Sequence, residues 1–170
     1  SKIIPREVVV HHCHHGVASE AKDWLQFVQA ATERRGFAFK AYYLDLELGS
    51  EFEARARKAR YDAVMKEVVS GDIVMTAHHR DDQVETLLIR LSQGSGLIGL
   101  AGIPMIRPFG SGVLIRPLLS LSRKQLKQVL VARKLKHITD PSNQDSSYLR
   151  NYVRLQFLPA LSRIAPKVRD

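Results

Sequence analysis

The feature that most constrains the fold of this chain is an apolar run that leads directly into polar residues and then into a helical pattern. Residues 73–77 are mostly β-branched or apolar, and residues 78–82 are His-His-Arg-Asp-Asp. Apolar residues then recur at the spacing of one helix face: Val84, Leu87, Leu88 and Leu91. The pattern predicts a strand, a tight turn and a helix whose N-terminus is capped by Asp81 and Asp82.

The polar residues of this segment are predicted to converge. At about 100° per residue, His78, Asp82 and Glu85 fall on one side of the helix, which is expected to face a crevice while the apolar side packs. Polar groups beyond the C-terminal end of a strand lie where open α/β sheets bind ligands. Asp81 and Asp82 can hold Mg²⁺ together with substrate phosphate oxygens. The alternative is that they only cap the helix and that Glu85 is solvated.

Length, charge and cysteine content limit the classes of protein to which the chain can belong. A chain of 170 residues, 45% of them hydrophobic, can bury a core, and one domain over residues 1–170 is expected. Lys and Arg number 26 against 17 Asp and Glu, which favours a polyanionic partner. A lone Cys13 excludes a disulfide within the chain. Because neither a signal peptide nor an apolar span of about 20 residues is visible, a cytoplasmic protein without membrane association is expected.

A histidine cluster follows the first strand-like segment. Residues 7–15 are predicted to form a buried strand that runs into four histidines and a thiol, and Gly16 ends it. A zinc site is one interpretation, but neighbouring residues on a strand point to opposite faces, and no second ligand group has the usual spacing. His14 and His15, next to a glycine that permits close approach, are better interpreted as lining a site.

Helical and strand patterns alternate in the segments that follow. Ser19 is expected to cap a helix that ends at the Arg-Arg-Gly of residues 34–36. Residues 37–44 alternate in the manner of a second strand. A further helix is predicted to begin at the capping box of residues 50–53 and to continue to about Val69.

That second helix carries a row of charged residues. Glu53, Arg57 and Arg60 share one face of it. The row is either a solvated surface whose charges pair with one another or a stripe that positions phosphates, for which arginine is well suited.

Glycines recur between residues 93 and 102, where the helix after the central motif ends. Because phosphate-binding loops open a helix after a strand, a flexible loop is predicted here in preference to a phosphate cradle. Residues 113–117 form a short predicted strand that Pro117 ends, which places Arg116 at its terminus.

Another helix is predicted from the capping box of Ser122 and Gln125. Its apolar residues point inward, and the outward row is cationic: Lys124, Lys127, Arg133 and Lys134. This row is interpreted either as a contact surface for nucleic acid or as a solvated face.

The last informative stretch is a turn followed by a helix. Asp-Pro-Ser-Asn at residues 140–143 is turn chemistry at every position. Arg150, Asn151 and Arg154 lie on the helix after it, and the two arginines are one turn apart.

Segments spread along the chain match one family: His-Cys-His-His-Gly (12–16), Glu53 with Ala56, Arg57, Arg60 and Tyr61, residues 76–86, Gly94-Ser-Gly, Ile115-Arg-Pro-Leu-Leu, Asp140-Pro-Ser-Asn, Arg150-Asn151 and Arg154. They resemble the N-terminal domain of bacterial tRNA(Ile)-lysidine synthetases over about residues 8–160. The central motif would also suit related tRNA thiolases of the same ATPase superfamily. Asp-Pro-Ser-Asn followed by Arg-Asn and Arg is more specific for the lysidine enzymes, and the missing Cys-x-x-Cys speaks against thiolases that carry an iron–sulfur cluster.

The resemblance implies an α/β fold in which helices flank an open parallel sheet, as in the N-type ATP pyrophosphatases and adenine nucleotide alpha hydrolase-like proteins. It also implies a reaction that needs ATP, Mg²⁺, free lysine and an isoleucine tRNA. ATP adenylates the C2 carbonyl oxygen of the wobble cytidine in the anticodon loop, pyrophosphate leaves, and the ε-amine of lysine displaces AMP. Mg²⁺ and arginines would neutralise phosphate charge, and a basic surface would hold the tRNA backbone. A homodimer is expected on the same ground.

By the same resemblance, the candidate site residues fall into two groups. The reaction centre consists of His78, Asp81, Asp82 and Glu85, with Asp81 and Asp82 as metal ligands. The substrate-binding candidates are His14, His15, Glu53, Arg57, Arg60, Arg116, Asp140, Asn143, Arg150, Asn151 and Arg154.

The chain departs from the family pattern at its start. The family opens with a strand, a Ser-Gly-Gly-x-Asp-Ser phosphate loop and a helix, whereas this chain begins Ser-Lys-Ile-Ile-Pro-Arg. The first βα unit and the family's C-terminal tRNA-binding domains are therefore missing. The chain is expected to be a fragment with little activity alone, or a degenerate relative that no longer binds ATP. A catalytically silent tRNA-binding module and a tRNA thiolase relative stay open as alternatives.

Overall fold

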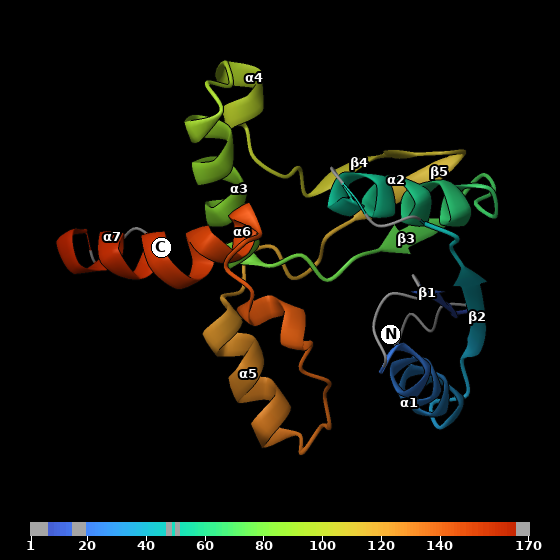
Figure 1. The fold of residues 1–170 in the computed structure, drawn as a ribbon. Helices are drawn as coiled ribbons and strands as arrows, with labels where there is room; N and C mark the ends of the chain where they lie inside the picture. The colour runs from blue at the N-terminus through green and yellow to red at the C-terminus, as the bar shows by residue number, and fades with distance from the viewer. Residues whose placement is uncertain (1–6, 15–19, 47–48, 50–51, 166–170) are drawn as a thin grey trace, which may run out of the picture. The chain divides into compact units, whose positions relative to one another are not determined.

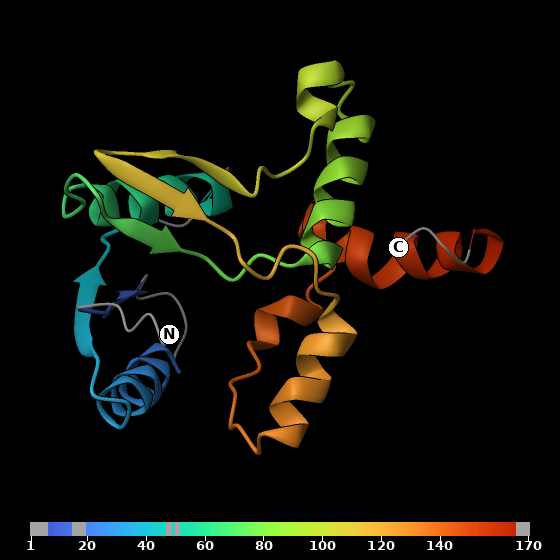
Figure 2. The same cartoon turned by 180° about the vertical axis from the view of Figure 1, so that it is seen from behind.

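The computed structural model describes residues 7–14, 20–46, 49 and 52–165. The chain divides into two compact units, residues 1–69 (unit 1) and 70–170 (unit 2), and each unit has its own sheet. Figure 1 shows the elements in chain order by colour, and Figure 2 shows them from behind. This division does not decide whether residues 1–170 are one domain, so that expectation stays a prediction.

Unit 1 is a parallel strand pair with a crossover helix. Its elements are β1 (Val9–His14), α1 (Ala21–Glu33), β2 (Ala38–Tyr43) and α2 (Phe52–Met65). β1 and β2 are parallel, in a register that places Val9 opposite Ala38, and α1 packs against both strands. A helix is needed here because parallel neighbours cannot be joined by a tight turn. Both predicted strands are confirmed, but the prediction that the first one is buried is wrong, because every residue of β1 is exposed or half-buried.

The ends of the two helices in unit 1 agree in part with the sequence patterns. α1 is followed by Gly36, whose φ of +71° is the left-handed conformation that favours glycine, as the Arg-Arg-Gly pattern predicts. α2 ends at Met65, earlier than the predicted Val69. The predicted caps Ser19 and Ser50 lie outside the described residues.

Unit 2 contains a mixed sheet and the helices that carry most candidate site residues. Its elements are β3 (Ile73–Met75), α3 (Arg80–Ser92), α4 (Leu97–Leu100), β4 (Ile106–Phe109), β5 (Gly112–Ile115), α5 (Arg123–Ala132), the 3₁₀ turn η1 (Pro141–Gln144), α6 (Leu149–Tyr152), the π-helical turn η2 (Val153–Phe157) and α7 (Leu158–Ile164). The strand order is β3-β5-β4, with β3 and β5 parallel and β4 and β5 antiparallel. The parallel pairs of both units, with their flanking helices, confirm the predicted α/β class.

The antiparallel hairpin β4–β5 was not expected. Phe109 pairs with Gly112, so a two-residue loop, Gly110-Ser111, joins the strands, and Gly110 has a φ of +57°. Short hairpin loops require this conformation at glycine or asparagine. The Gly-Ser pair was a visible signal that the chain reverses here.

The buried face of α3 is not the one that apolar spacing predicts. Glu85 and Thr86 are its buried residues, whereas Leu91 is more than half exposed. The prediction that the apolar side packs while the polar side faces a crevice is therefore wrong for this helix. The physical reason is that arginines from α6 and η2 cover the polar side and pair with it.

Side chains of α3 fasten the glycine-rich segment that follows the helix. Arg90 donates hydrogen bonds to the carbonyl oxygens of Gly99 and Gly102, at 2.6 and 2.9 Å. The amide of Gln83 bonds both the N–H and the carbonyl of Ile103. The segment is thus tied back onto α3.

Across the described part of the chain, no helix is long and apolar enough to cross a bilayer.

Candidate active site

Two carboxylates occupy the first turn of α3. His79, in an extended conformation, is the N-cap, and its N–H donates to Asp82 Oδ2 at 2.9 Å. Asp81 Oδ2 accepts the backbone N–H of Arg123 at 2.8 Å. The N-cap itself is therefore His79 and not Asp81, whereas Asp82 caps the helix as predicted, as the N3 residue of a capping box. Negative charge in the first turn also favours the helix dipole.

Glu85 is the most buried charged group of unit 2, with 1% of its surface exposed. Arg154 donates to both of its oxygens, from Nε at 2.7 Å and from Nη2 at 3.0 Å. This two-pronged pair raises the pKa of Arg154, chiefly through its hydrogen bond to Glu85. Burying a carboxylate without such a partner would lower the stability of the fold, so the pairing with Arg154 is what allows Glu85 to be buried.

Asp82 and Arg150 complete the cluster but are held more loosely. Arg150 Nη1 lies 3.5 Å from Glu85 Oε2 and 3.7 Å from Asp82 Oδ1, and Arg154 Nη2 lies 3.9 Å from the same Asp82 oxygen. The hydroxyl of Thr86 accepts a hydrogen bond from Arg150 at 3.3 Å. We call Asp82, Glu85, Arg150 and Arg154 the acid–arginine network. Its charges attract one another, and only the Glu85–Arg154 pair has close hydrogen-bond geometry.

The Asp-Pro-Ser-Asn turn supplies one hydrogen-bond acceptor to this network. Asn143 Oδ1 accepts from Arg154 Nη1 at 3.3 Å. Asp140 shapes the turn, because its Oδ1 accepts the N–H of Ser142. Asn151 is buried, and its amide nitrogen donates to the carbonyls of Ser142 and Asp145, both at 2.8 Å. Of the three polar candidates, Asn143 therefore contacts the network, while Asp140 and Asn151 hold the turn that presents it.

Arg154 lies on the π-helical turn η2. Such widened turns are rare and are often found at functional sites. Pro159 follows shortly after the turn, and a proline cannot donate to the carbonyl four residues before it and crowds that carbonyl in a regular α-helix. A wider turn relieves that conflict at the point where Arg154 reaches Glu85.

The two histidines before α3 have separate partners. His78 Nδ1 lies 2.9 Å from the hydroxyl of Thr76, and His79 Nδ1 lies 3.4 Å from Asp82 Oδ2. The convergence of Asp82 with Glu85 is confirmed by their shared arginines, whereas that of His78 stays a prediction. Sequence reasoning missed His79 and Thr86. Its assumption that Asp81 and Asp82 begin the helix hid His79, and Thr86 is next to Glu85 on the buried face.

Arg116 is 2% exposed and points into the protein. It donates to the carbonyl of Pro104, and its Nε has no hydrogen-bond acceptor among the described residues. Its predicted contact with an anionic ligand therefore requires that the guanidinium become accessible. The geometry itself assigns Arg116 to holding the loop before β4.

The candidates of unit 1 are mostly on the surface. Glu53, Arg57 and Arg60 are exposed on α2, and the Arg57 guanidinium lies 5.3 Å from the centre of the Tyr61 ring. The helix forms its 2.6 Å ion pair elsewhere, between Lys58 and Asp62. The half-buried His14 has its ring centre 5.4 Å from that of Tyr43, and His15 lies outside the described residues.

A second polar cluster lies on one face of the β1–β2 pair. His11 Nδ1 is 2.8 Å from the Tyr42 hydroxyl, and Lys40 pairs with Glu67 at 2.7 Å. Burial lowers the pKa of His11 and raises that of the Cys13 thiol. With the pKa of the Cys13 thiol raised and the Lys40–Glu67 pair exposed, this cluster has no evident catalytic arrangement.

A family model described as the PP-loop domain matches residues 2–161 of the chain. The chain belongs to the PP-loop domain family. Known members with similar sequences include the tRNA(Ile)-lysidine synthase of Pseudomonas aeruginosa, 41% identical over 92% of this chain, and that of Methylococcus capsulatus, 43% identical over 92%. The chain spans only about 35% of the length of these relatives. The resemblance stated from the motifs is confirmed.

Among solved structures, this PP-loop domain resembles the U34-tRNA thiolase NcsA from Methanococcus maripaludis with its [4Fe-4S] cluster. The TM-score is 0.72, the match covers 99% of this chain and 61% of that one, and the sequences are 16% identical. At this identity the likeness shows the fold alone. It supports the predicted fold class.

The carboxylates of this PP-loop domain fit a magnesium ion that is also held by a substrate. Within the described residues, no three His, Cys, Asp or Glu side chains gather as a self-sufficient metal site. Mg²⁺ does not require one, since it is often bound by one or two carboxylates together with phosphate oxygens. Asp81 and Asp82 are adjacent, and each uses its Oδ2 to accept a backbone N–H. Asp82 Oδ1 faces two guanidinium groups, which a bound cation would have to displace.

Proposed function

We propose that this chain belongs to the catalytic part of a ligase that joins free lysine to C2 of the wobble cytidine in an isoleucine tRNA at the expense of ATP, and that it has little activity alone. The observation that carries the proposal is the acid–arginine network, in a PP-loop domain that is 41–43% identical to proteins named tRNA(Ile)-lysidine synthase. A cytoplasmic location and a homodimer belong to the same proposal.

The network is chemically suited to an amino acid substrate. Lysine carries two ammonium groups and one carboxylate, and the network offers two carboxylates and two guanidinium groups. Arg154 and Glu85 form a fixed frame because both prongs of their pair are short. The contact between Asp82 and Arg150 is long, at 3.7 Å. Asp82 can therefore exchange Arg150 for a substrate ammonium, and Arg150 can exchange Asp82 for a substrate carboxylate, at little cost.

The two chemical steps require neutralisation of the phosphate charge and loss of one proton from the lysine ε-amine. The C2 carbonyl oxygen of cytidine attacks the α-phosphate of ATP and pyrophosphate leaves; the ε-amine of lysine then attacks C2 and AMP leaves. The amine must release a proton to water before it attacks. Asp81 and Asp82 would hold Mg²⁺, which when bound neutralises phosphate charge. His78 is kept in the reaction centre. Glu53, Arg57 and Arg60 are proposed to position substrate or phosphate, and Arg116 to contact an anionic ligand.

The test uses the whole polypeptide that the gene encodes, with ATP, Mg²⁺, lysine and an isoleucine tRNA transcript whose wobble base is cytidine. Release of pyrophosphate that depends on the transcript, followed by incorporation of labelled lysine, is expected. A transcript with uridine at the wobble position should give neither. Asp82→Asn should abolish lysine incorporation, whereas Asp62→Asn, which removes a half-exposed carboxylate of α2, should leave it unchanged.

The same assay distinguishes the proposed ligase from two other functions. A silent tRNA-binding module would bind the transcript without releasing pyrophosphate. A thiolase would incorporate sulfur from a sulfide donor in place of lysine, and it rests on the fold likeness alone. Either result in the wild-type protein would replace the proposed ligase.

A further inference from the structure

One surface of unit 2 has a charge distribution that the site does not use. From Arg123 to Thr139 the sequence contains no Asp or Glu. The cations of this stretch are all exposed: Arg123, Lys124, Lys127, Arg133, Lys134 and Lys136. None of these six forms an ion pair with a described residue. We call them the α5 cationic face.

The cationic face differs from an ordinary solvated helix. Helix α2 shows the ordinary case, because it mixes Glu and Asp with its cations and pairs Lys58 with Asp62. Interleaved charges of both signs keep a surface soluble without attracting one kind of partner. The α5 cationic face has no such neutralisation, and its uncompensated charge attracts polyanions.

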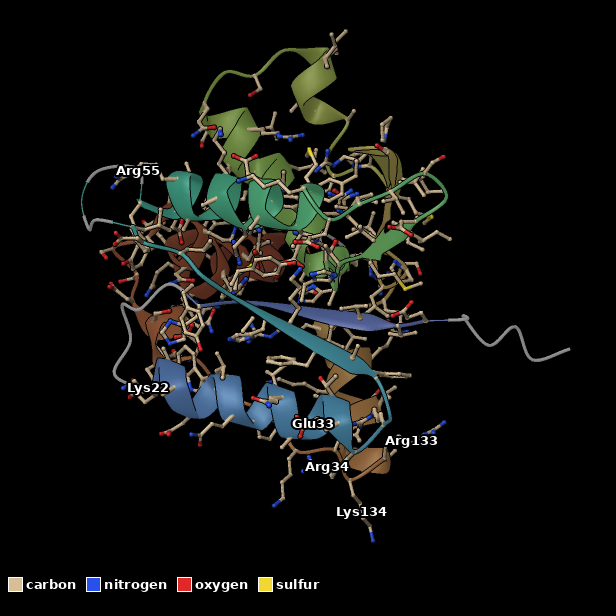
Figure 3. The ribbon with its side chains drawn as sticks, turned by 90° about the vertical axis from the view of Figure 1, so that its right-hand side faces the viewer. Lys22, Glu33, Arg34, Arg55, Arg133 and Lys134 are labelled. Carbon is tan, nitrogen blue, oxygen red and sulfur yellow. The ribbon has the colours of Figure 1, made fainter. Side chains whose placement is uncertain are left out.

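The end of α5 adds an independent observation. Lys134 has a φ of +49°, the left-handed conformation at the position just past the helix. Glycines take the corresponding conformation after α1 and α3, at Gly36 and Gly94. A lysine there costs roughly 0.5–1 kcal/mol relative to glycine. Figure 3 shows Arg133 and Lys134 projecting from this end of the helix, so the strained residue presents its charge outward.

The cationic face starts beside the candidate site. The N–H of Arg123 donates to Asp81 at 2.8 Å, and the N–H of Arg80 donates to the carbonyl of Leu121 at 2.9 Å. The first turns of α5 and α3 are therefore fastened together. From there α5 extends for roughly 15 Å, as expected for ten residues, and Figure 1 shows it running away from the start of α3. A chain of phosphates along α5 would lead to the acid–arginine network.

We propose that the α5 cationic face binds the phosphate backbone of the RNA whose base enters the candidate site. The inference rests on the proposed function, which makes an RNA the substrate. An anionic membrane is less suited, because surface-binding helices expose Trp, Phe or Leu on their apolar side. Residues 123–139 contain no Trp or Phe, and neither leucine of α5 is exposed. The exposed large apolar side chains of this stretch are Val129, Val131 and Leu135.

The test measures binding of a labelled isoleucine tRNA transcript by the full-length polypeptide at several salt concentrations. The triple variant Lys124→Gln, Lys127→Gln, Arg133→Gln is compared with a control of equal charge change in unit 1, Lys22→Gln, Arg34→Gln, Lys66→Gln. Because each lost phosphate contact lowers the slope of log K against log salt by 0.7 to 0.9, the α5 variant should lower it by about 2 to 3. Its affinity near 0.1 M salt should fall about tenfold or more, and the control should stay close to wild type.

Lys134→Gly separates binding from folding. It relieves the backbone conformation and removes a charge, so the melting temperature should rise while RNA affinity falls severalfold. Equal slopes for the α5 and control variants, or stronger binding to vesicles of anionic phospholipid than to the transcript, would overturn the α5 interface. Pyrophosphate release in the same samples judges the ligase separately: release with equal slopes rejects the interface and keeps the ligase.

Discussion

Two ion pairs of equal length lie in different environments in the two units. Arg154 Nε and Glu85 Oε1 are 2.7 Å apart in unit 2, and so are Lys40 Nζ and Glu67 Oε1 in unit 1. The side chain of Glu85 is 1% exposed, whereas those of Lys40 and Glu67 are nearly half exposed. Distance alone does not distinguish the two pairs. Burial does, because a buried charge depends on its partner while an exposed one can be solvated by water.

Removing one carboxylate from each pair gives the largest expected difference. Glu85→Gln keeps the shape but leaves Arg154 with only the distant carboxylate of Asp82, 3.9 Å away. The substitution should lower the free energy of unfolding by about 2–4 kcal/mol, a little under the range for fully buried pairs, because Arg154 is 18% exposed. Glu67→Gln should change stability little. Urea unfolding followed by circular dichroism measures both.

The single tryptophan adds a local probe to that experiment. Trp24 lies on α1, so its fluorescence follows unit 1. The transition of Glu85→Gln should therefore shift more by circular dichroism than by fluorescence. Equal stability of the two variants would show that the burial difference between the two pairs carries no energetic weight.

Buried amide and hydroxyl groups extend the comparison to uncharged residues. Asn151 in unit 2 bonds two carbonyls of a distant turn, whereas Thr32 in unit 1 bonds only the carbonyl of Val28 one turn away. Asn151→Ala should cost about 1–3 kcal/mol, since it leaves buried acceptors without a donor. Thr32→Val should cost less, because Val28 belongs to a helix that already uses that carbonyl. Thermal unfolding of both variants shows whether the long-range hydrogen bonds of Asn151 stabilise the protein more than the local hydrogen bond of Thr32.

Asn151→Ala also has a functional consequence. The turn that Asn151 holds presents Asn143 to Arg154, so the Michaelis constant for lysine should rise more than the turnover number falls. A fall in turnover alone would place Asn151 in the chemistry and not in the positioning of the turn.

The contrast between the units explains what sequence could predict. Strands, helices and the candidate carboxylates follow from local periodicity and short motifs, and β1, β2 and α3 were found in this way. The pairing of Glu85 with Arg154 spans residues far apart in sequence, so periodicity on α3 alone pointed to the wrong buried face. Arg116 was placed correctly at the end of β5, but its burial depends on Pro104 and on packing that no local pattern encodes.

The ends of α1 and α5 provide a smaller matched test. Gly36 has open space where a Cβ would stand, so Gly36→Ala changes little except the left-handed backbone, and should cost about 1 kcal/mol. Lys134→Gly should stabilise unit 2 by about 0.5–1 kcal/mol. Chemical denaturation of the two variants should give shifts of opposite sign. Shifts of the same sign would contradict the interpretation that backbone conformation governs both positions.

The smallest effect expected is a pH dependence confined to unit 1. Burial lowers the pKa of His11 and of His12 in the folded state, so between those values and the ordinary 6.5 the unfolded chain binds more protons. Stability should therefore be full above about pH 6.5 and should fall as the pH is lowered from 7 to 5. Unfolding followed by Trp24 fluorescence should show this loss, and His11→Gln with His12→Gln should flatten the profile. The exposed His137 of unit 2 is the matched control, because His137→Gln should leave the fluorescence profile unchanged. A wild-type profile that stays flat would contradict the partial desolvation that lowers the pKa of His11 and of His12.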